Sequence, residues 1–367
     1  MKRTKTSRPA ARPISSLFGA RSTAQDLFIE EQRQAKLSDF VGTLARIHEL
    51  VKFADIATQI DALCPRPDRR KGGRPPYPTE VLVRMVFLQA LYGLSDEQLE
   101  YQLLDRRSFQ HFCGLHDALN LPDSRTLWQF KQRLVRDEQN NKVEGAALIF
   151  DAVKQQLQAH GFIPRGGQMV DASIVQAPIT QVTSGQREAI NSGQRPEGLS
   201  DKQLAHIDQD ARWTKKHGKS FYGYKVHANV DAKHKLIQRI KVTPANVDDG
   251  NTLPDVMDKS NTSAELTADR GYDSAANREA LQEAGLRDGI ARKAKVGKAP
   301  GKRLKARNAT INKKRARVEH VFAGMAQLGG KVVRAMNLAR NELGITLKCV
   351  AYNLKRWVWL EGQQAPA

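Results

Sequence analysis

The chain has 367 residues, and its 59 Lys and Arg against 39 Asp and Glu give a formal net charge of +20. An excess that large favours an extended polyanion, usually nucleic acid, as partner. No apolar run is long enough to span a bilayer and no lipidation signal is present, so we expect no membrane association. The three cysteines are far apart and lack a CxxC pair, which argues against a disulfide framework or a zinc site.

The first part of the chain has the pattern of a basic tail and then helices. "MKRTKTSRPAARP" is not followed by an apolar signal-peptide core, so we expect a cytoplasmic protein. Apolar residues recur at helical spacing within 25–62. The prolines, glycines and basic residues of "PRPDRRKGGRPPYP" then predict an exposed linker at 65–78. We therefore assign residues 1–64 to a tail with N-terminal helices, separate from the rest of the chain.

A helical, DNA-binding domain is predicted over 65–160. Pro78 suits the first turn of a helix that Gly93 ends, and "SDEQ" at 95–98 has the spacing of a capping box that opens a second helix. A third helix is expected after Pro122 with its apolar residues on one face. Its basic residues lie off that face, and with the net charge they suggest a helix-turn-helix arrangement whose DNA contacts are Arg125, Lys131 and Arg133. An ordinary helical bundle with a solvated basic face fits these residues equally well.

From residue 161 to 360 the pattern changes to an α/β domain. Strands are expected at 166–175, 221–231, 236–244, 264–268 and 287–292, the second and third forming a hairpin. Helices are expected near 248–258, 274–285 and 315–328, with a last amphipathic helix before a tail at 361–367. The polar segment at about 181–220 is predicted to be a mobile insertion. This element order predicts a mixed sheet flanked by helices.

Three carboxylates in this domain are flanked by apolar residues in the sequence. Asp171 lies in the first strand, Asp269 ends the strand "AELTA", and Glu319 lies in "RARVEHVF". If the first and fourth strands are neighbours, Asp171 and Asp269 lie side by side, and a helix across the sheet can bring Glu319 to them. Clustered carboxylates repel unless a cation neutralises them, and oxygen ligands select Mg²⁺ or Mn²⁺. The three residues are thus a candidate two-metal site for attack on a phosphodiester.

Five phrases in this order, "MVDASIVQAP", "KVHANVD", "TPANVDDGNTLP", "ADRGYDS" and "RARVEHVF", resemble the DDE transposases of bacterial insertion sequences. "GRPPYP" and "LPDSRTLWQFKQRL" are similar to the group whose helical domain precedes a ribonuclease-H-like catalytic core. The resemblance covers roughly residues 70–358. It implies that Asp171, Asp269 and Glu319 are the metal-binding catalytic triad, and that Arg315 is the basic residue beside the acid. Asn312 and Ala326 stand where related enzymes often carry Tyr and Lys.

The resemblance also implies partners and further contacts. We expect double-stranded DNA, both inverted-repeat ends and target, a homodimer or higher oligomer on it, and a place on the bacterial nucleoid. Residues 292–317 contain twelve Lys or Arg and no acid, so we expect a mobile segment that grips phosphates. Its candidate contacts, with two on the second strand, are Lys225, His227, Lys302, Arg303, Lys305, Arg307 and Arg315.

The function favoured by these patterns is a transposase that cleaves DNA at the ends of an insertion sequence and joins the 3′ ends to a target. Two alternatives remain. One is a Mg²⁺-dependent nuclease of the same fold without strand transfer. The other is a transposase-derived DNA-binding protein that has lost catalysis, against which the intact Asp171, Asp269 and Glu319 argue.

Overall fold

The fold is described by a computed structural model. It covers residues 35–36, 42–65, 72, 75–115, 120–135, 144–294, 297 and 299–364. The described residues from Ile47 onward belong to one compact unit. None of the helices in these ranges is both long and apolar enough to cross a membrane.

The described residues before 160 are mainly helical. Its helices are α2 (Thr43–Leu50), α3 (Phe53–Leu63), α4 (Thr79–Tyr92), α5 (Asp96–Asp105), α6 (Arg107–Cys113), α7 (Ser124–Val135) and α8 (Glu144–Ala159). The predicted boundaries are confirmed where sequence signals were strongest. Gly93 ends α4 in the left-handed conformation, and Ser95 and Gln98 form the capping box of α5.

The second region contains a six-stranded mixed sheet. Its strands are β1 (Gln168–Gln176), β2 (Arg212–Lys216), β3 (Lys219–Asp231), β4 (Ile237–Pro244), β5 (Glu265–Ala268) and β6 (Arg287–Ile290). The order is β2-β3-β1-β5-β6, with β4 also paired to β3. The hairpin of β3 and β4 is as the sequence predicts. β1 and β5 are neighbours, which is the condition under which Asp171 and Asp269 were expected to lie side by side.

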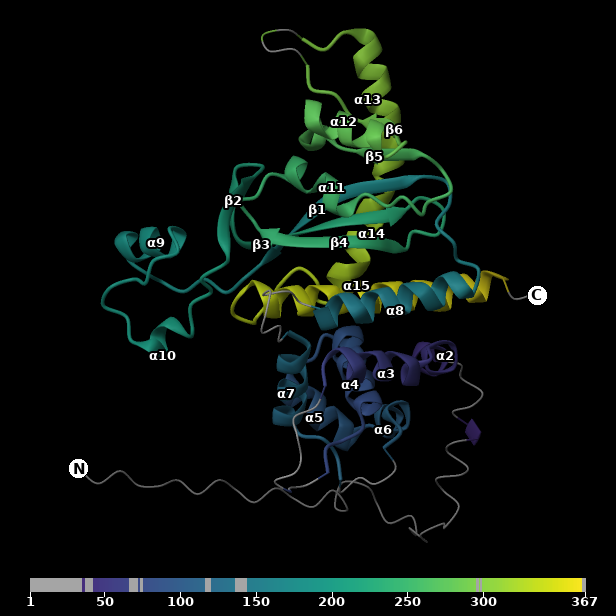
Figure 1. The fold of residues 1–367 in the computed structure, drawn as a ribbon, viewed down its shortest axis with the longest axis vertical. Helices are drawn as coiled ribbons and strands as arrows, with labels where there is room; N and C mark the ends of the chain where they lie inside the picture. Colours follow the sequence, from purple (N-terminus) through teal and green to yellow (C-terminus); the bar gives the residue numbers. More distant parts are fainter. Residues whose placement is uncertain are drawn as a thin grey trace, which may run out of the picture. The chain divides into compact units, whose positions relative to one another are not determined.

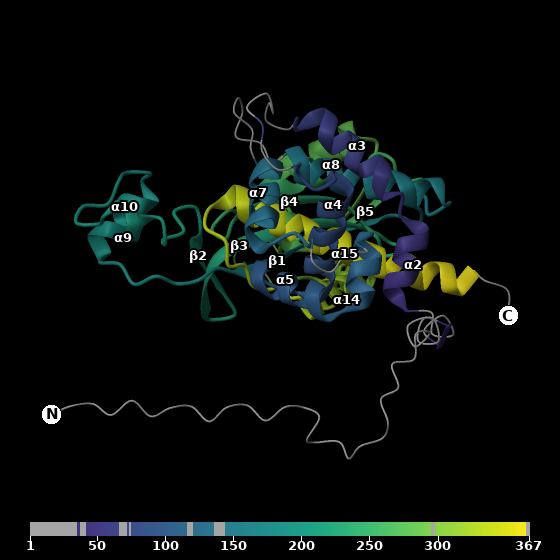
Figure 2. The same cartoon turned by 90° about the horizontal axis from the view of Figure 1, so that it is seen from below.

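Helices cover both faces of this sheet (Figure 1). On one face, a core of buried side chains joins β1, β5 and β6 to α11 (Leu253–Val256) and α12 (Ala275–Glu283). α14 (Arg317–Gln327) packs on β1, and α15 (Leu338–Gln364) packs on β4. α15 also packs on α4, α7 and α8, so this last helix connects the sheet to the N-terminal helices. Figure 2 shows these N-terminal helices in front of α15 and the sheet.

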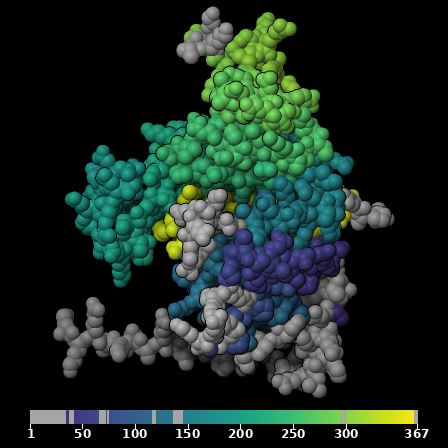
Figure 3. Space-filling view, viewed as in Figure 1, coloured from purple at the N-terminus to yellow at the C-terminus, as the bar shows by residue number. Residues whose placement is uncertain are grey.

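The segment 181–220, expected to be a mobile insertion, has regular secondary structure that was not predicted from the sequence. It contains α9 (Ser184–Asn191), α10 (Asp201–Leu204) and β2. Thr183 and Ser200 each form a capping box, a local signal that the polar composition concealed. α9 and α10 stand apart from the rest of the sheet domain in both ribbon views, and their teal surface projects beside it in Figure 3. The mobility of this segment stays a prediction.

The basic run 292–317 is also corrected. Much of it forms α13 (Lys302–Arg315), which packs on β5 and β1, so the expected mobile segment is largely helical. Its charges do not prevent the helix because three of its cations lie near acids. Lys314 is paired with Glu265 at 2.6 Å, Arg315 is paired with Asp171, and Arg307 lies 3.8 Å from Asp288. The helix expected from Arg315 is divided at Ala316, where α13 ends and α14 begins.

Candidate active site

Asp171 is positioned by strand alternation. Its neighbour Val170 belongs to the core shared with α11 and α12, so Asp171 points to the opposite face, where α13 and α14 pack. One carboxylate oxygen accepts a hydrogen bond from the Ala172 amide at 2.9 Å. The other accepts from the Arg315 guanidinium. With only 15% of its side chain exposed, Asp171 is held firmly in place.

Asp269 comes directly after β5. β1 and β5 run parallel with Gln168 beside Leu266 and Met169 beside Thr267. Continuing this register toward the carboxyl ends brings Asp171 level with Asp269. The Asp269 side chain accepts a hydrogen bond from the Gly271 amide at 2.7 Å and caps the short helix Arg270–Tyr272. The turn therefore fixes the carboxylate at the end of its strand.

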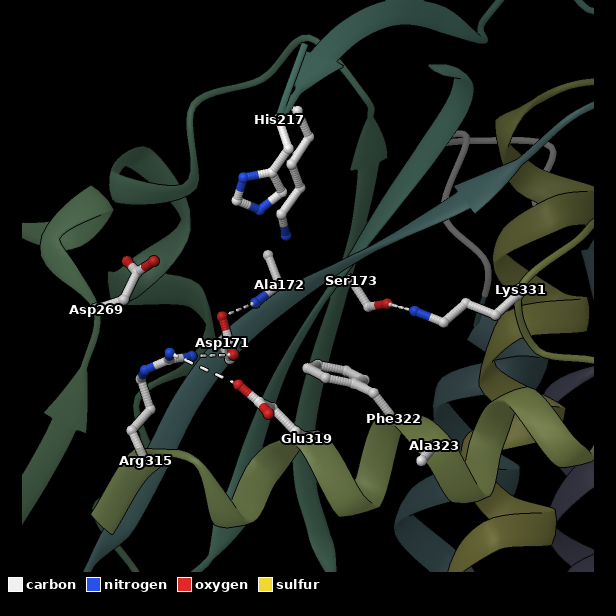
Figure 4. A pocket seen from close by; sticks show the side chains of 11 residues that line it. Asp171, Ala172, Ser173, His217, Asp269, Arg315, Glu319, Phe322, Ala323 and Lys331 are labelled. Atoms are coloured by element: carbon white, nitrogen blue, oxygen red, sulfur yellow. Dashed lines mark hydrogen bonds and ion pairs between the residues drawn. The ribbon is translucent and has the colours of Figure 1, made fainter. Parts of the chain in front are cut away.

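Glu319 comes from the first turn of α14. Val318 and Phe322 on that helix are buried, whereas the Glu319 side chain is 68% exposed. Its carboxylate lies 4.0 Å from the Arg315 guanidinium. Figure 4 shows Asp171 and Glu319 both facing Arg315, with Asp269 projecting from the neighbouring strand end.

One cavity of about 560 Å³ brings the three acids together. Its lining comprises Asp171, Ala172, Ser173, Lys216, His217, Asp269, Arg315, Glu319, Phe322, Ala323 and Lys331. Lys216, His217 and Lys331 were not among the residues expected from the sequence. The dipeptide His217–Gly218 between two strand-like runs was a usable hairpin signal for the first two, whereas nothing local marked Lys331.

The electrostatics of the cavity depend on Arg315. Burial raises the pKa of Asp171 and the nearby Asp269 carboxylate adds to the rise, while the Arg315 guanidinium opposes it. Within the described residues, no three Asp, Glu, His or Cys side chains are arranged closely enough to form a metal-holding group. The acids share a cavity, and the single guanidinium pairs with Asp171 and lies 4.0 Å from Glu319, so it offsets only part of their negative charge. Three carboxylates are nevertheless the donor type that suits a hard divalent cation.

The other residues predicted to contact DNA lie outside this cavity. Lys225 is paired with Asp249 at 2.8 Å, and His227 is fully buried with its Nε2 2.9 Å from the Thr243 hydroxyl. Their DNA contacts stay predictions, and the burial of His227 argues against its own.

On α7, Lys131 is paired with Asp96, and Arg133 donates to Asp61 and to the Cys64 carbonyl, whereas Arg125 is exposed. On α13, Lys302, Arg303 and Lys305 are exposed. Arg307 on the same helix instead donates to the Ile290 carbonyl at 2.7 Å. The predicted contacts thus include both engaged and exposed cations.

Comparison with protein families agrees with this arrangement. The family model "Transposase DDE domain" matches residues 164–354, which include β1, β5, α14 and all three acids. The chain belongs to this transposase family. A second model, "Transposase domain (DUF772)", matches residues 30–133. No solved structure matches the chain.

Membership of the DDE transposase family assigns the domain its ribonuclease-H-like fold, and the observed mixed sheet flanked by helices is consistent with it. The family implies DNA as substrate and divalent metal ions as cofactor. The fold class and the family inferred from the sequence are thereby confirmed.

Proposed function

We propose that this transposase binds the inverted-repeat ends of an insertion sequence, cleaves the DNA there and joins the 3′ ends to target DNA. The observation that supports this most is the meeting of Asp171, Asp269 and Glu319, from three separate elements, in one cavity. Structural acids that serve only as caps have no reason to share a cavity open to a substrate.

In this proposal the three carboxylates hold Mg²⁺ or Mn²⁺. The bound ions would activate water or a 3′-hydroxyl and stabilise the leaving oxygen. Asp171 and Asp269 are fixed in advance by the Ala172 and Gly271 amides. Glu319 is exposed on the face of α14 and is free to adjust its rotamer. Two fixed carboxylates and one mobile carboxylate could therefore adjust to the metal ions and the substrate without any change in the sheet.

Arg315 has a separate role in the proposal. Its guanidinium contacts Asp171 and lies near Glu319, and it carries the positive charge that holds these two acids at one wall of the cavity. A guanidinium is also a bidentate donor for phosphate. We infer that it orients the phosphodiester beside the acids, so its loss slows cleavage more than it weakens binding.

The test is the variant Asp269→Asn, assayed for metal-dependent nicking and strand transfer on a duplex of the inverted repeats that flank the reading frame. Asn keeps an oxygen that can accept the Gly271 amide but loses the charge, so the fold is kept. Losing a ligand that stabilises the transition state by several kcal/mol lowers the rate by more than about a thousandfold. DNA affinity should change less than about threefold, since binding depends on the basic surface.

Glu283→Gln is the matched control, because Glu283 is an exposed acid on α12 outside the cavity. It should leave both activities unchanged. Substantial strand transfer by Asp269→Asn would refute the triad. Nicking without joining by the unaltered protein would favour the nuclease alternative, and binding without nicking would favour the non-catalytic one.

A further inference from the structure

The hairpin of β2 and β3 carries a concentration of cations at its tip. Lys215, Lys216, His217 and Lys219 are exposed, and none of them forms an ion pair with any described residue. Lys216 is directly opposite Lys219 in the register. Like charges placed directly across a strand pair destabilise it. A hairpin built this way is suited to an anion at its tip.

The tip is held in a defined position. His217 and Gly218 have φ of 50° and 77°, the positive values that a tight two-residue turn requires. Behind the tip, Trp213 packs on Tyr222 with ring centroids 5.3 Å apart, and the Tyr222 hydroxyl donates to the Asp208 carbonyl at 2.8 Å. At Gly223 a β-carbon would collide with the Val175 carbonyl of β1, so β3 lies tightly against the strand that carries Asp171. The hairpin is thus braced from the face opposite Lys216.

A third cation reaches the same cavity from another element. Lys331 comes after α14, and its carbonyl accepts from the Gln176 amide at 2.9 Å at the end of β1. Its ammonium donates to the buried Ser173 hydroxyl and lies 5.9 Å from the centre of the Phe322 ring. Figure 4 shows Lys331 and Arg315 entering the cavity from different sides, with His217 near the hairpin tip. Burial lowers the pKa of Lys331, and the nearby charge of Lys216 lowers it further.

Two lysines that repel each other therefore face one cavity whose other wall carries the acids. On this basis we propose that Lys216, His217 and Lys331 form a phosphate subsite that binds a non-scissile phosphate of the DNA strand. The subsite lies next to the place where the scissile phosphodiester meets Asp171, Asp269 and Glu319. It rests on the proposed function for the identity of the DNA, and it assigns the β2–β3 hairpin a role in placing the strand.

The alternation of side chains along β2 provides a matched control for the hairpin. Lys215 and Lys216 are adjacent in β2, so their side chains leave opposite faces, and only Lys216 lines the cavity. Lys216→Gln and Lys331→Gln together remove two subsite cations, whereas Lys215→Gln removes a cation from the other face. Each phosphate contact adds about 0.9 to the log–log salt slope of binding to duplex DNA. The double variant should therefore lose about 1 to 2 units of slope, and Lys215→Gln should lose almost none.

The binding experiment is run without divalent metal on two duplexes, one carrying the inverted-repeat end and one of random sequence. On the end-bearing duplex, single uncharged methylphosphonates are placed at each position around the scissile bond. For the unaltered protein and for Lys215→Gln, one position or two adjacent ones should weaken binding about tenfold to a hundredfold, as expected for loss of a charged hydrogen bond. The double variant should be insensitive there.

An unchanged salt slope in the double variant, an equal loss in Lys215→Gln, or full methylphosphonate sensitivity in the double variant would each overturn the subsite. Because these measurements need no cleavage, an inactive triad would not affect them. The random duplex keeps the salt measurement valid even if end recognition fails.

Discussion

Two basic helices of this protein, α7 and α13, use their charges differently. On α7, Lys131 and Arg133 are partly buried and bound to acids of the same helical region. On α13, Lys302, Arg303 and Lys305 are exposed and form no ion pair in the part of the chain that the structure describes. α13 is the more basic of the two helices, and its paired cations, Lys314 and Arg315, lie at its other end. We therefore expect the exposed cations of α13, rather than the paired cations of α7, to contact DNA.

The sharpest test of this comparison is the triple variant Lys302→Gln, Arg303→Gln and Lys305→Gln. Loss of up to three phosphate contacts should flatten the log–log salt slope of DNA binding by about 2 to 3 units. End preference should be unchanged because phosphate contacts carry no base information. The measurement is a salt titration on end-bearing and random duplexes.

Arg307→Gln is the control on the same helix. Arg307 donates to the carbonyls of Ile290 and Asp288, so its loss should lower the free energy of unfolding by about 1 kcal/mol and leave the slope nearly unchanged. If the triple variant binds with an undiminished slope, α13 is a solvated helix and the comparison fails.

A second test concerns α7. The Lys131 ammonium lies 2.5 Å from Asp96 and also donates to Gln89 at 3.4 Å, joining α7 to α5 and α4. Lys131→Gln leaves a partly buried carboxylate without its cation, so we expect the free energy of unfolding to fall by about 1 to 2 kcal/mol. DNA affinity should fall less than about twofold. Denaturant unfolding and a binding titration measure the two quantities.

Arg125→Gln on the exposed side of α7 is the companion variant. It should not change stability, and it should reduce the preference for end-bearing over random DNA if Arg125 reads bases. A Lys131→Gln protein of full stability but weakened binding would mean that α7 presents its paired lysine to DNA after all.

The smallest expected effect concerns a cation that is half-buried and donates only to a carbonyl. Lys348 of α15 donates to the Ala90 carbonyl of α4 at 2.9 Å, and burial lowers its pKa to about 8. In the unfolded chain a lysine titrates near 10.4, so between about pH 8 and pH 10 the folded protein binds fewer protons than the unfolded chain. The free energy of unfolding must therefore rise with pH across this window and stay level just below it.

Lys348→Met should reduce the rise in the free energy of unfolding with pH by about 1 kcal/mol, a value that allows for the partial exposure of Lys348. The measurement is urea unfolding at several pH values, and Lys355→Met, an exposed lysine of the same helix, is the control. Identical pH profiles for Lys348→Met and the unaltered protein would mean that Lys348 is solvated.

Several elements of the fold were determined by the sequence itself. The strand-like runs of β1 and β3, the Gly93 end of α4 and the capping box at Ser95 are local signals, and the structure confirms these elements. Asp171, Asp269 and Glu319 could be identified as candidates because each lies within a run of apolar residues that is expected to be buried. The parallel pairing of β1 with β5, on which the meeting of the first two acids depends, was shown only by the structure.

What the sequence could not decide were the partners of charged residues far apart in the chain. The sequence around each cation does not indicate its partner. This holds for the contacts of Lys131 with Asp96, of Arg315 with Asp171 and of Lys331 with Ser173. Such pairs depend on how helices cross and which strand ends face them, because burial makes an unpaired charge costly whatever its sequence neighbours. The tertiary structure therefore decided which cations are paired within the fold and which are exposed without an acidic partner among the described residues.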